Sequence, residues 1–206
     1  MEEMSGVGLF IDFEGGEKAG KSTQLKRAAE YLRSLGIKVA ETREPGGGDI
    51  HIREKLLDAK NKNLTAADEL DLFCEDRRLH VQNVILPALA RNETVLCDRF
   101  EPSSIAYQGY GRGLNLNLIK SKSAKSRQGV WPDLIFLLDG DPEKLLLREA
   151  LTTRFDQESL DFHRRVRNGF LEMASADPDT YVVVNAELPL EDVWQKVKEQ
   201  IDRLYE

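Results

Sequence analysis

The chain of 206 residues has little cysteine, no excess of basic residues and no long apolar run. With only two cysteines, Cys74 and Cys97, it is unlike a disulfide-rich secreted domain and typical of a protein kept in a reducing compartment. Acidic residues outnumber basic ones by 36 to 29, and the net charge of -7 disfavours binding to DNA or RNA through a broadly basic surface. The longest apolar run, at residues 134–138, is far too short to cross a bilayer.

Met1-Glu2-Glu3 is acidic and no apolar stretch follows a basic region, so we do not expect the N-terminal region to be a secretory signal. We therefore expect a cytoplasmic location, with no membrane partner and no nucleic-acid partner. A hydrophobic share of 41% with 32% charged residues is ordinary for a soluble globular protein. A chain of this length has room for one α/β domain, which we predict to span residues 1–206.

Short apolar segments alternate with longer helical patterns, which predicts parallel strands joined by helical crossovers. We expect five strands, each apolar enough to be buried on both faces of a sheet, at residues 9–13, 38–42, 94–97, 134–138 and 181–184. We expect helices at residues 22–35, 68–89, 141–150 and 157–176, and then a last helix with an apolar stripe of Val193, Val197, Ile201 and Leu204. Asp12 interrupts the first strand, and we expect it to face a polar neighbour or the end of the sheet rather than to take part in chemistry.

Residues 15–22, Gly-Gly-Glu-Lys-Ala-Gly-Lys-Ser, match the pattern G-x-x-x-x-G-K-[ST] of a phosphate-binding loop, or P-loop. The pattern directly follows the first predicted strand and begins a helix, where backbone N–H groups and the helix N-terminus favour phosphate. We expect Lys21 to reach the β- and γ-phosphates of a nucleotide and Ser22 to place its hydroxyl on Mg²⁺. The residues predicted to bind the nucleotide in this loop are Gly15, Gly16, Glu17, Lys18, Ala19, Gly20, Lys21, Ser22 and Thr23.

Four further polar clusters are needed to separate kinases from GTPases and ATPase motors, which share the P-loop. One is Thr-Arg-Glu-Pro-Gly-Gly at residues 42–47, with Arg53 soon after it. A second, Phe-Cys-Glu-Asp-Arg-Arg at residues 73–78, lies on a predicted helix. A third, Asp-Arg-Phe at residues 98–100, ends a predicted strand at the sheet edge where ligands bind in such folds. The fourth is Ser-Ser-Ile-Ala-Tyr-Gln-Gly at residues 103–109.

Together with Pro-Asp-Leu at residues 132–134 and Arg-Phe-Asp-Gln-Glu-Ser-Leu-Asp-Phe at residues 154–162, these segments resemble a thymidylate kinase of the bacterial type. The resemblance runs from about residue 9 to residue 176. It implies an α/β fold of the P-loop NTPase class, a doubly wound five-stranded parallel sheet flanked by helices, with a short lid at about residues 148–156. It also implies transfer of the γ-phosphoryl group of ATP to dTMP with Mg²⁺, giving dTDP, and a homodimer formed through helices.

The resemblance places five residues around the base and sugar of dTMP. Phe73 would stack on thymine, since an aromatic ring offers a flat apolar surface to a base, and Arg77 would donate to a thymine carbonyl. Gln108 and Ser104 would complete the contacts, so that a base with other donors and acceptors would leave polar groups unpaired. Tyr107 would lie against the deoxyribose, where a 2′-hydroxyl would crowd it.

The resemblance also assigns groups around the acceptor phosphate and the metal ion. Arg53 and Arg99 would hold the acceptor phosphate, for which guanidinium groups are geometrically suited. Glu17 would contact the sugar or phosphate side of the acceptor. Asp98 would join Ser22 in holding Mg²⁺.

Catalysis of phosphoryl transfer depends mainly on positioning and on positive charge around the transferred group. Thymidylate kinases divide between those with a basic residue inside the P-loop and those with glycine there and arginines in the lid, and this chain has Lys18. We therefore expect Lys18 to stabilise the transition state, alongside Lys21 and Arg99. Of the two lid arginines, Arg154 would be a second catalytic cation and Arg148 would lie beside the adenine.

The chain departs from the family pattern before Arg53, where the segment is about two residues shorter than usual and has Gly48 in place of a common threonine. The position of Arg53 is therefore left open by the resemblance.

Three alternatives to a dTMP kinase remain. One is a nucleoside-monophosphate kinase of altered pyrimidine preference, accepting for example dUMP. Another is a catalytically reduced protein that binds nucleotides and serves a partner, which is disfavoured by the joint presence of Lys18, Lys21, Ser22, Asp98 and Arg99. The third is a GTPase switch, which is disfavoured because the sequence lacks the Asn-Lys-x-Asp motif for guanine.

Overall fold

A computed structural model describes residues 8–61, 64–150 and 152–205. Within them, five parallel strands form one sheet in the order β2-β3-β1-β4-β5. The strands are β1 (Phe10–Gly15), β2 (Val39–Arg43), β3 (Thr94–Asp98), β4 (Leu134–Asp139) and β5 (Tyr181–Asn185). All five strands predicted from apolar segments are confirmed, with ends that differ by at most two residues.

Helices connect the strands and cover the sheet. They are α1 (Lys21–Ser34), α2 (Ile50–Leu57), α3 (Ala66–His80), α4 (Leu86–Ala90), α5 (Glu101–Ser104), α6 (Leu116–Ser126), α7 (Pro142–Leu145), α8 (Leu160–Ala176) and α9 (Leu190–Tyr205). Two π-helical segments, η1 (Val81–Ile85) and η2 (Ile105–Gly111), continue α3 and α5, and a 3-10 turn, η3 (Leu146–Arg148), continues α7. In the described ranges, every helix is too short or too polar to cross a membrane.

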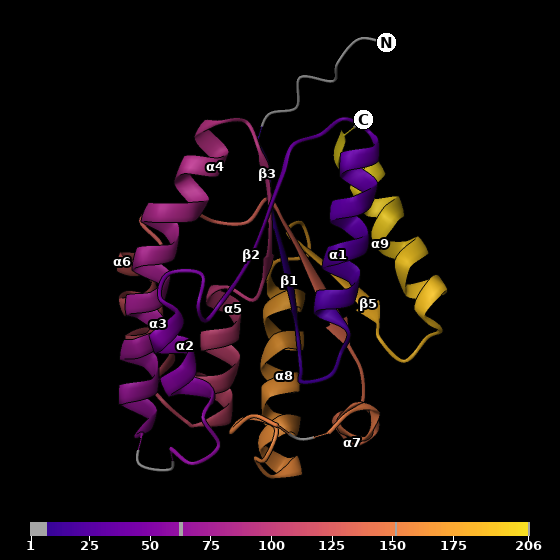
Figure 1. The fold of residues 1–206 in the computed structure, drawn as a ribbon. Helices are drawn as coiled ribbons and strands as arrows, with labels where there is room; N and C mark the ends of the chain where they lie inside the picture. The colour runs from indigo at the N-terminus through magenta and orange to yellow at the C-terminus, as the bar shows by residue number, and fades with distance from the viewer. Residues whose placement is uncertain (1–7, 62–63, 151, 206) are drawn as a thin grey trace.

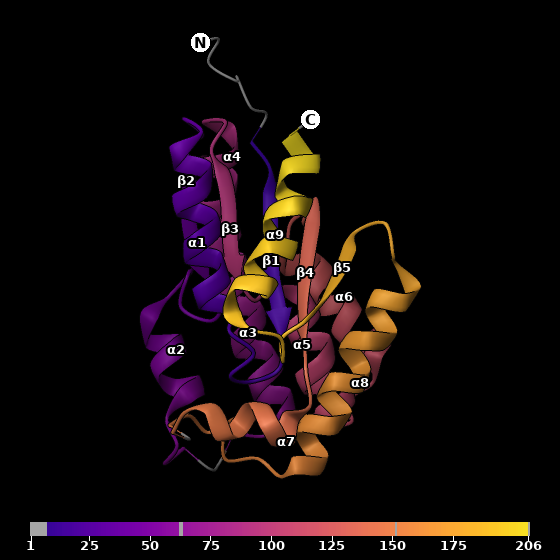
Figure 2. The same ribbon diagram turned by 90° about the vertical axis from the view of Figure 1, so that its right-hand side faces the viewer.

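Helices lie on both faces of the sheet (Figure 1). On one face α1 and α9 pack against alternate strand residues such as Ile11 and Phe13. On the other face α8 packs against Ile135 and Leu137 of β4. Figure 2, seen from the side of α1 and α9, shows α9 in front of the sheet and α8 beyond its edge. The predicted doubly wound fold is confirmed.

The apolar stripe predicted on the last helix is also confirmed, because Val193, Val197 and Ile201 of α9 are buried against the sheet and Leu204 is half-buried. Burial of such a stripe is what holds an amphipathic helix on a sheet.

Two predicted helices are too long. The helix expected over residues 141–150 ends with η3, because the backbone of Glu149 is extended. The helix expected over residues 157–176 begins at Leu160, where the Ser159 side chain accepts a hydrogen bond from a backbone N–H of the first turn. Helices α2 and α6 and the α5–η2 segment were not predicted, because they are short or rich in glycine and serine and show no clear helical period.

Asp12 lies in the middle of β1, opposite Cys97 of β3 and Ile135 of β4, so the expectation that it faces the end of the sheet is wrong. Its side chain is completely buried, and neither carboxyl oxygen accepts a hydrogen bond from any described residue. Burial and then the nearby Glu14 raise the pKa of Asp12 well above its ordinary value. Its polar neighbour is therefore another acid.

Candidate active site

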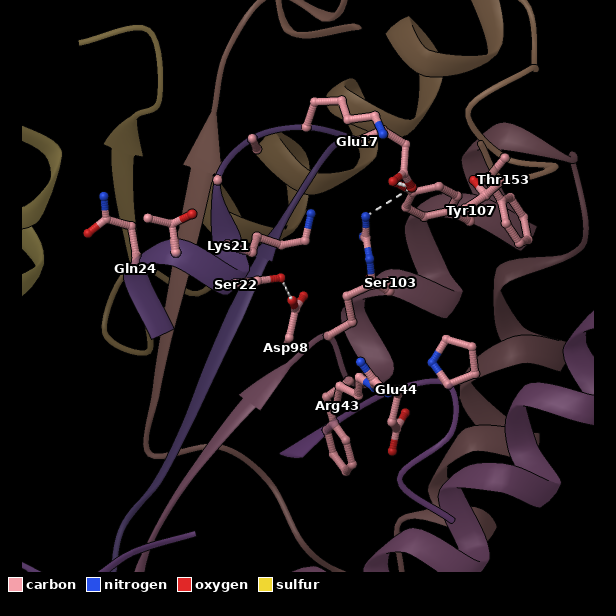
Figure 3. A pocket seen from close by; sticks show the side chains of 18 of the residues that line it. Glu17, Lys21, Ser22, Gln24, Arg43, Glu44, Asp98, Ser103, Tyr107 and Thr153 are labelled. Atoms are coloured by element: carbon pink, nitrogen blue, oxygen red, sulfur yellow. Dashed lines mark hydrogen bonds and ion pairs between the residues drawn. The ribbon is translucent and has the colours of Figure 1, made fainter. Parts of the chain in front are cut away.

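The carboxyl ends of the strands open into a cavity of about 550 Å³. Its walls come from the P-loop, the segments that follow β2, β3 and β5, helix α3, segment η2 and the segment after η3 (Figure 3). Open parallel sheets bind ligands at this edge, where neighbouring connections leave toward opposite faces. Because β1 is the central strand, it delivers the P-loop to the middle of this cavity.

The P-loop requires glycine at its first position. Gly15 has a φ of +138°, and a Cβ there would lie only 2.4 Å from the carbonyl oxygen of Leu138 on β4. The Lys21 Nζ atom donates to the carbonyl oxygens of Gly15 (3.2 Å) and Gly16 (2.7 Å). Burial lowers the pKa of Lys21 to about 8. A triphosphate offers this amine stronger, charged acceptors than the two carbonyls do.

Ser22 and Asp98 meet at the base of the cavity, although one begins α1 and the other ends β3. The Ser22 hydroxyl donates to a carboxylate oxygen of Asp98 (Figure 3). Oxygen ligands of this kind suit Mg²⁺, which in nucleotide sites is held by one or two protein groups and the phosphates. The pair therefore fits the metal role expected of it.

Glu17 joins two of the residues predicted to bind the acceptor. It accepts a hydrogen bond from Tyr107 Oη (2.6 Å) and another from Arg99 Nη2 (2.9 Å). Burial alone would raise the pKa of Glu17, but Arg99 and then Lys21 outweigh burial and lower the pKa to about 2. The charged carboxylate thus holds the Arg99 guanidinium over the Tyr107 ring, 5.0 Å from its centroid.

A buried ion pair holds Arg77 against the cavity. Arg77 is 1% exposed, its Nε donates to Glu44 Oε2 (2.9 Å), and its Nη2 donates to Ser104 Oγ (3.0 Å). The other oxygen of Glu44 contacts His80 Nδ1 at 2.9 Å, which fixes the carboxylate. The remaining nitrogen, Nη1, has its partner Ser123 Oγ at a long 3.4 Å. Ser123 is not among the described residues that line the cavity, whereas Ser104 is, so Nη2 is the Arg77 nitrogen that bonds to a residue of the cavity wall.

Aromatic rings and an amide also line the cavity. Phe73 is half-buried, and its ring centroid lies 6.2 Å from that of Phe155. Gln108 also lines the cavity, and its Nε2 donates to Glu69 Oε2 at 3.1 Å. A flat apolar surface beside a fixed amide is a suitable arrangement for a nucleobase.

The short segment before Arg53 packs its backbone directly on α3. A Cβ at Gly48 would lie 2.0 Å from the carbonyl oxygen of Asp76, so a threonine does not fit there. The Asp76 carboxylate accepts the backbone N–H groups of Gly48 (3.2 Å) and Asp49 (2.7 Å). Arg53 lines the cavity, and its Nη1 donates to the Pro45 carbonyl (2.7 Å). The shortened segment therefore still brings Arg53 to the site.

Lys18 connects the P-loop to the segment predicted to be the lid. Its ammonium forms ion pairs with Asp156 (3.5 Å) and Glu149 (3.7 Å). Its φ of +59° lies in the left-handed region that favours glycine. Arg148 lines the same cavity and donates to the Ala186 carbonyl (2.7 Å). The predicted lid segment thus contacts the P-loop through charged groups.

Arg154 points elsewhere. Its Nη1 donates to Glu69 Oε1 (2.7 Å) and its Nε to the Leu56 carbonyl (3.3 Å). With Arg112 it borders a separate cavity of about 340 Å³, and it is not among the described residues that line the P-loop cavity. In this conformation Arg154 would have to leave Glu69 to reach a transferred phosphoryl group.

Comparison with known proteins agrees with this geometry. A family model described as "Thymidylate kinase" matches residues 13–197. The chain belongs to the thymidylate kinase family.

Named relatives resemble the chain over most of its length. A thymidylate kinase from Geobacter sp. (strain M21) is 44% identical over 96% of this chain and 92% of its own length. One from Dehalococcoides mccartyi (strain CBDB1) is 42% identical over 95% of this chain and 96% of its own length. The crystal structure of thymidylate kinase from Ehrlichia chaffeensis superposes with a TM-score of 0.78 at 33% identity, covering 94% of this chain and 98% of that one.

The described cavity collects most of the residues predicted for the site. Gly15, Gly16 and Arg154 are the exceptions among them, the two glycines because they lie at the start of the P-loop. The functional roles of the collected residues stay predictions.

Sequence analysis did not identify several residues that line the P-loop cavity. The segment after β5 contributes Ala186, Leu188 and Leu190, and the lid contributes Phe155. The rule that ligands bind beyond the carboxyl ends of parallel strands would have indicated the segment after β5. Glu44 lies in the Thr-Arg-Glu-Pro-Gly-Gly motif at residues 42–47, but its pairing with the buried Arg77 is visible only in the fold.

Proposed function

We propose that this chain transfers the γ-phosphoryl group of ATP to dTMP, giving ADP and dTDP. The observation that carries the proposal is that one cavity joins a P-loop with Lys21 to a pocket with aromatic, amide and guanidinium groups suited to a nucleoside monophosphate. Membership of the thymidylate kinase family supports the same reaction. We treat residues 1–206 as one thymidylate-kinase-like domain, with residues 148–156 as its lid.

In the proposed step, an oxygen of the dTMP phosphate attacks the γ-phosphorus of ATP. A new P–O bond forms, the bond to the β-phosphate oxygen breaks, and its electron pair stays on ADP. Arg53 and Arg99 hold the acceptor phosphate, since guanidinium groups match its oxygens. Glu17, through its bond to Arg99, keeps that guanidinium in place before dTMP arrives.

Mg²⁺ would be held by Ser22 and Asp98, whose side-chain oxygens already lie in contact. When bound, the ion neutralises charge on the β- and γ-phosphates. The contact between the two side chains orders them before the nucleotide binds.

Lys18 would meet the charge that develops on the transferred phosphoryl group, because it is the P-loop residue whose ammonium already lies at the lid. Arg148 would lie beside the adenine, near Ala186. Arg154 would serve as a second catalytic cation only after release from Glu69.

Thymine would lie against Phe73, with a carbonyl accepting from Arg77 and with Gln108 and Ser104 completing the contacts. Tyr107 would lie against the deoxyribose, held there by its bond to Glu17. These contacts favour a pyrimidine that carries carbonyl groups.

We also propose a homodimer formed through helices and a cytoplasmic location. The resemblance to the family supports the first. The presence of only two cysteines and the proposed use of ATP as donor support the second.

The test is a coupled assay of ADP production with ATP, Mg²⁺ and each of dTMP, dUMP, dCMP, dGMP and AMP. We expect turnover of dTMP well above that of dCMP, dGMP and AMP, because the site is shaped for a carbonyl-bearing pyrimidine. Lys21→Ala, prepared in parallel, should lose turnover and so excludes a contaminating kinase.

Equal turnover of all five acceptors would contradict the proposal. A preference for dUMP over dTMP would favour the kinase of altered pyrimidine preference. Nucleotide binding without any turnover would favour the catalytically reduced protein.

A further inference from the structure

We infer that Glu69 is a positioning residue that fixes the orientation of the Gln108 amide and thereby selects a base with an N–H donor on its ring. Glu69 lies on α3, outside the set of residues that line the P-loop cavity in the described chain. The inference rests on the proposed function, because it concerns how the acceptor base is chosen.

Glu69 is 1% exposed and is surrounded by donors. One oxygen, Oε1, accepts from Arg154 Nη1 at 2.7 Å and pairs with Arg112 Nη2 at 3.1 Å. Two guanidinium groups therefore balance the carboxylate in a buried place, where an unpaired charge would be costly. A carboxylate in this state only accepts hydrogen bonds.

The second oxygen of Glu69 decides which end of the Gln108 amide faces it. Oε2 accepts from Gln108 Nε2 at 3.1 Å and from Arg112 Nε at 3.3 Å. If the Gln108 amide were turned around, its carbonyl oxygen would face the Glu69 carboxylate. The carboxylate has no hydrogen to donate, so no hydrogen bond would form. The NH₂ end of Gln108 is therefore committed to Glu69, and the carbonyl end is left for a ligand.

The Gln108 carbonyl oxygen is an unmet acceptor. Gln108 is 0% exposed, it lines the cavity, and its Oε1 has no hydrogen-bond partner among the residues that the structure describes. A buried acceptor without a donor is unfavourable by itself. A ligand that brings a donor to this oxygen removes that penalty on binding.

The donor that fits is the ring N–H between the two carbonyls of thymine. In cytosine the equivalent ring nitrogen is itself an acceptor, so it would oppose the Gln108 oxygen rather than bond to it. Sites that bury a committed polar group reject ligands that leave the group unpaired. Glu69 thus sets the preference without touching the base.

The Glu69→Gln variant gives the sharpest test, because it should turn the Gln108 amide around. The carbonyl oxygen of the new glutamine should take the Oε1 position, where Arg154 Nη1 and Arg112 Nη2 are its closer donors, and its NH₂ group would then face Gln108. The bond from Arg112 Nε to the Oε2 position, which is the longest of these contacts at 3.3 Å, would be lost. The Gln108 NH₂ group would then face the base. We expect the ratio of the dCMP to the dTMP dissociation constant, measured by calorimetry, to fall by about tenfold or more.

Glu75→Gln is the matched control, because Glu75 lies on the same helix but is exposed and pairs only with Arg78 at the surface. It should leave the ratio unchanged. Glu69→Asp keeps the negative charge but withdraws it from Gln108 by one methylene. It should lose part of the discrimination without the reversal.

A double variant shows whether the effect runs through the amide. With Gln108→Leu in place, adding Glu69→Gln should not change the dCMP to dTMP ratio further. A ratio that stays at the wild-type value in both Glu69→Gln and Glu69→Asp overturns the inference. A wild-type protein that shows no preference for dTMP would instead contradict the proposed function, so the two failures are distinguishable.

Discussion

At the residue scale, Asp12 is the least expected group in the fold. Strand interiors of parallel sheets are normally apolar, and a buried carboxyl without a donor costs free energy of folding. The sequence showed that Asp12 interrupts an apolar run, but it did not show what the side chain meets. The answer depends on Glu14, two positions along the same face of β1.

Asp12→Asn should raise the free energy of unfolding by on the order of 1 to 3 kcal/mol at pH 8, and by less at pH 5. The unfolded chain releases the Asp12 proton above the ordinary pKa of 3.8, whereas the folded protein keeps it because its pKa is raised. The wild-type protein therefore loses stability as the pH rises above about 4, and asparagine has no such proton to lose. Urea unfolding of both proteins at the two pH values measures this.

Asp68→Asn is a control, because its effect on stability should be opposite to that of Asp12→Asn. Hydrogen bonds from the side chain and then the backbone of Thr65 lower the pKa of Asp68, so the stability that it contributes is present above its ordinary pKa and lost in acid. This variant should be destabilised at pH 8. A gain from Asp12→Asn that is as large at pH 5 as at pH 8 would contradict the account of the buried proton.

At the element scale, the P-loop and the lid share charges. Asp156 is 2% exposed and accepts the backbone N–H groups of Thr152 (3.0 Å) and Thr153 (2.8 Å), while its Oδ2 lies 3.5 Å from Lys18. The same carboxylate thus orders the lid turn and holds the P-loop cation. Lys18 is therefore placed by the lid as well as by its own loop.

Lys18→Ala should lower kcat by about a hundredfold or more while the dissociation constants of ATP and dTMP change by no more than a few-fold. The reason is that a charge on the transferred group stabilises the transition state more than either bound substrate. Steady-state kinetics and calorimetry provide the two readings. Lys18→Arg is the control, since it keeps the charge.

Lys18→Gly separates charge from backbone strain. It should lose kcat as the alanine variant does, yet be more stable than that variant, because a φ of +59° suits glycine better. If Lys18→Ala keeps nearly full kcat while Arg154→Ala abolishes it, the catalytic cation comes from the lid and the role proposed for Lys18 is wrong.

The elements differ in how well the sequence predicts them. Apolar runs gave all five strands, and the P-loop pattern gave the loop between β1 and α1, because both signals are local. The α5–η2 segment has no helical period, yet it carries Ser104, Tyr107 and Gln108 to the cavity through a π-helical turn. The direction of Arg154 depends on Glu69, 85 positions away, and no spacing rule contains that contact.

At the scale of the whole molecule, the expected homodimer should appear as a mass of twice the chain mass in sedimentation equilibrium. Leu118 on α6 is 45% exposed on the outer helical layer. Leu118→Arg should weaken self-association if this layer forms the contact, because an arginine would be buried without a partner. Leu147→Arg is the matched control, since Leu147 is 84% exposed on η3 near the lid.

A wild-type protein that sediments as a monomer would contradict the homodimer. A dimer that is equally stable in Leu118→Arg would place the contact on another part of the surface.

The single carboxylate of Glu69 has a thermodynamic consequence for the complete cycle. One oxygen accepts from Gln108, which we propose to read the base, and the other accepts from Arg154 of the proposed lid, so the proposed base site and the proposed lid share one anchor. Such linkage is reciprocal. If bound dTMP changes the affinity for ATP by some factor, bound ATP must change the affinity for dTMP by the same factor. A mismatched base that strains the amide also strains the anchor of the lid. Under the proposed function, the identity of the base would thereby be read a second time by the proposed lid.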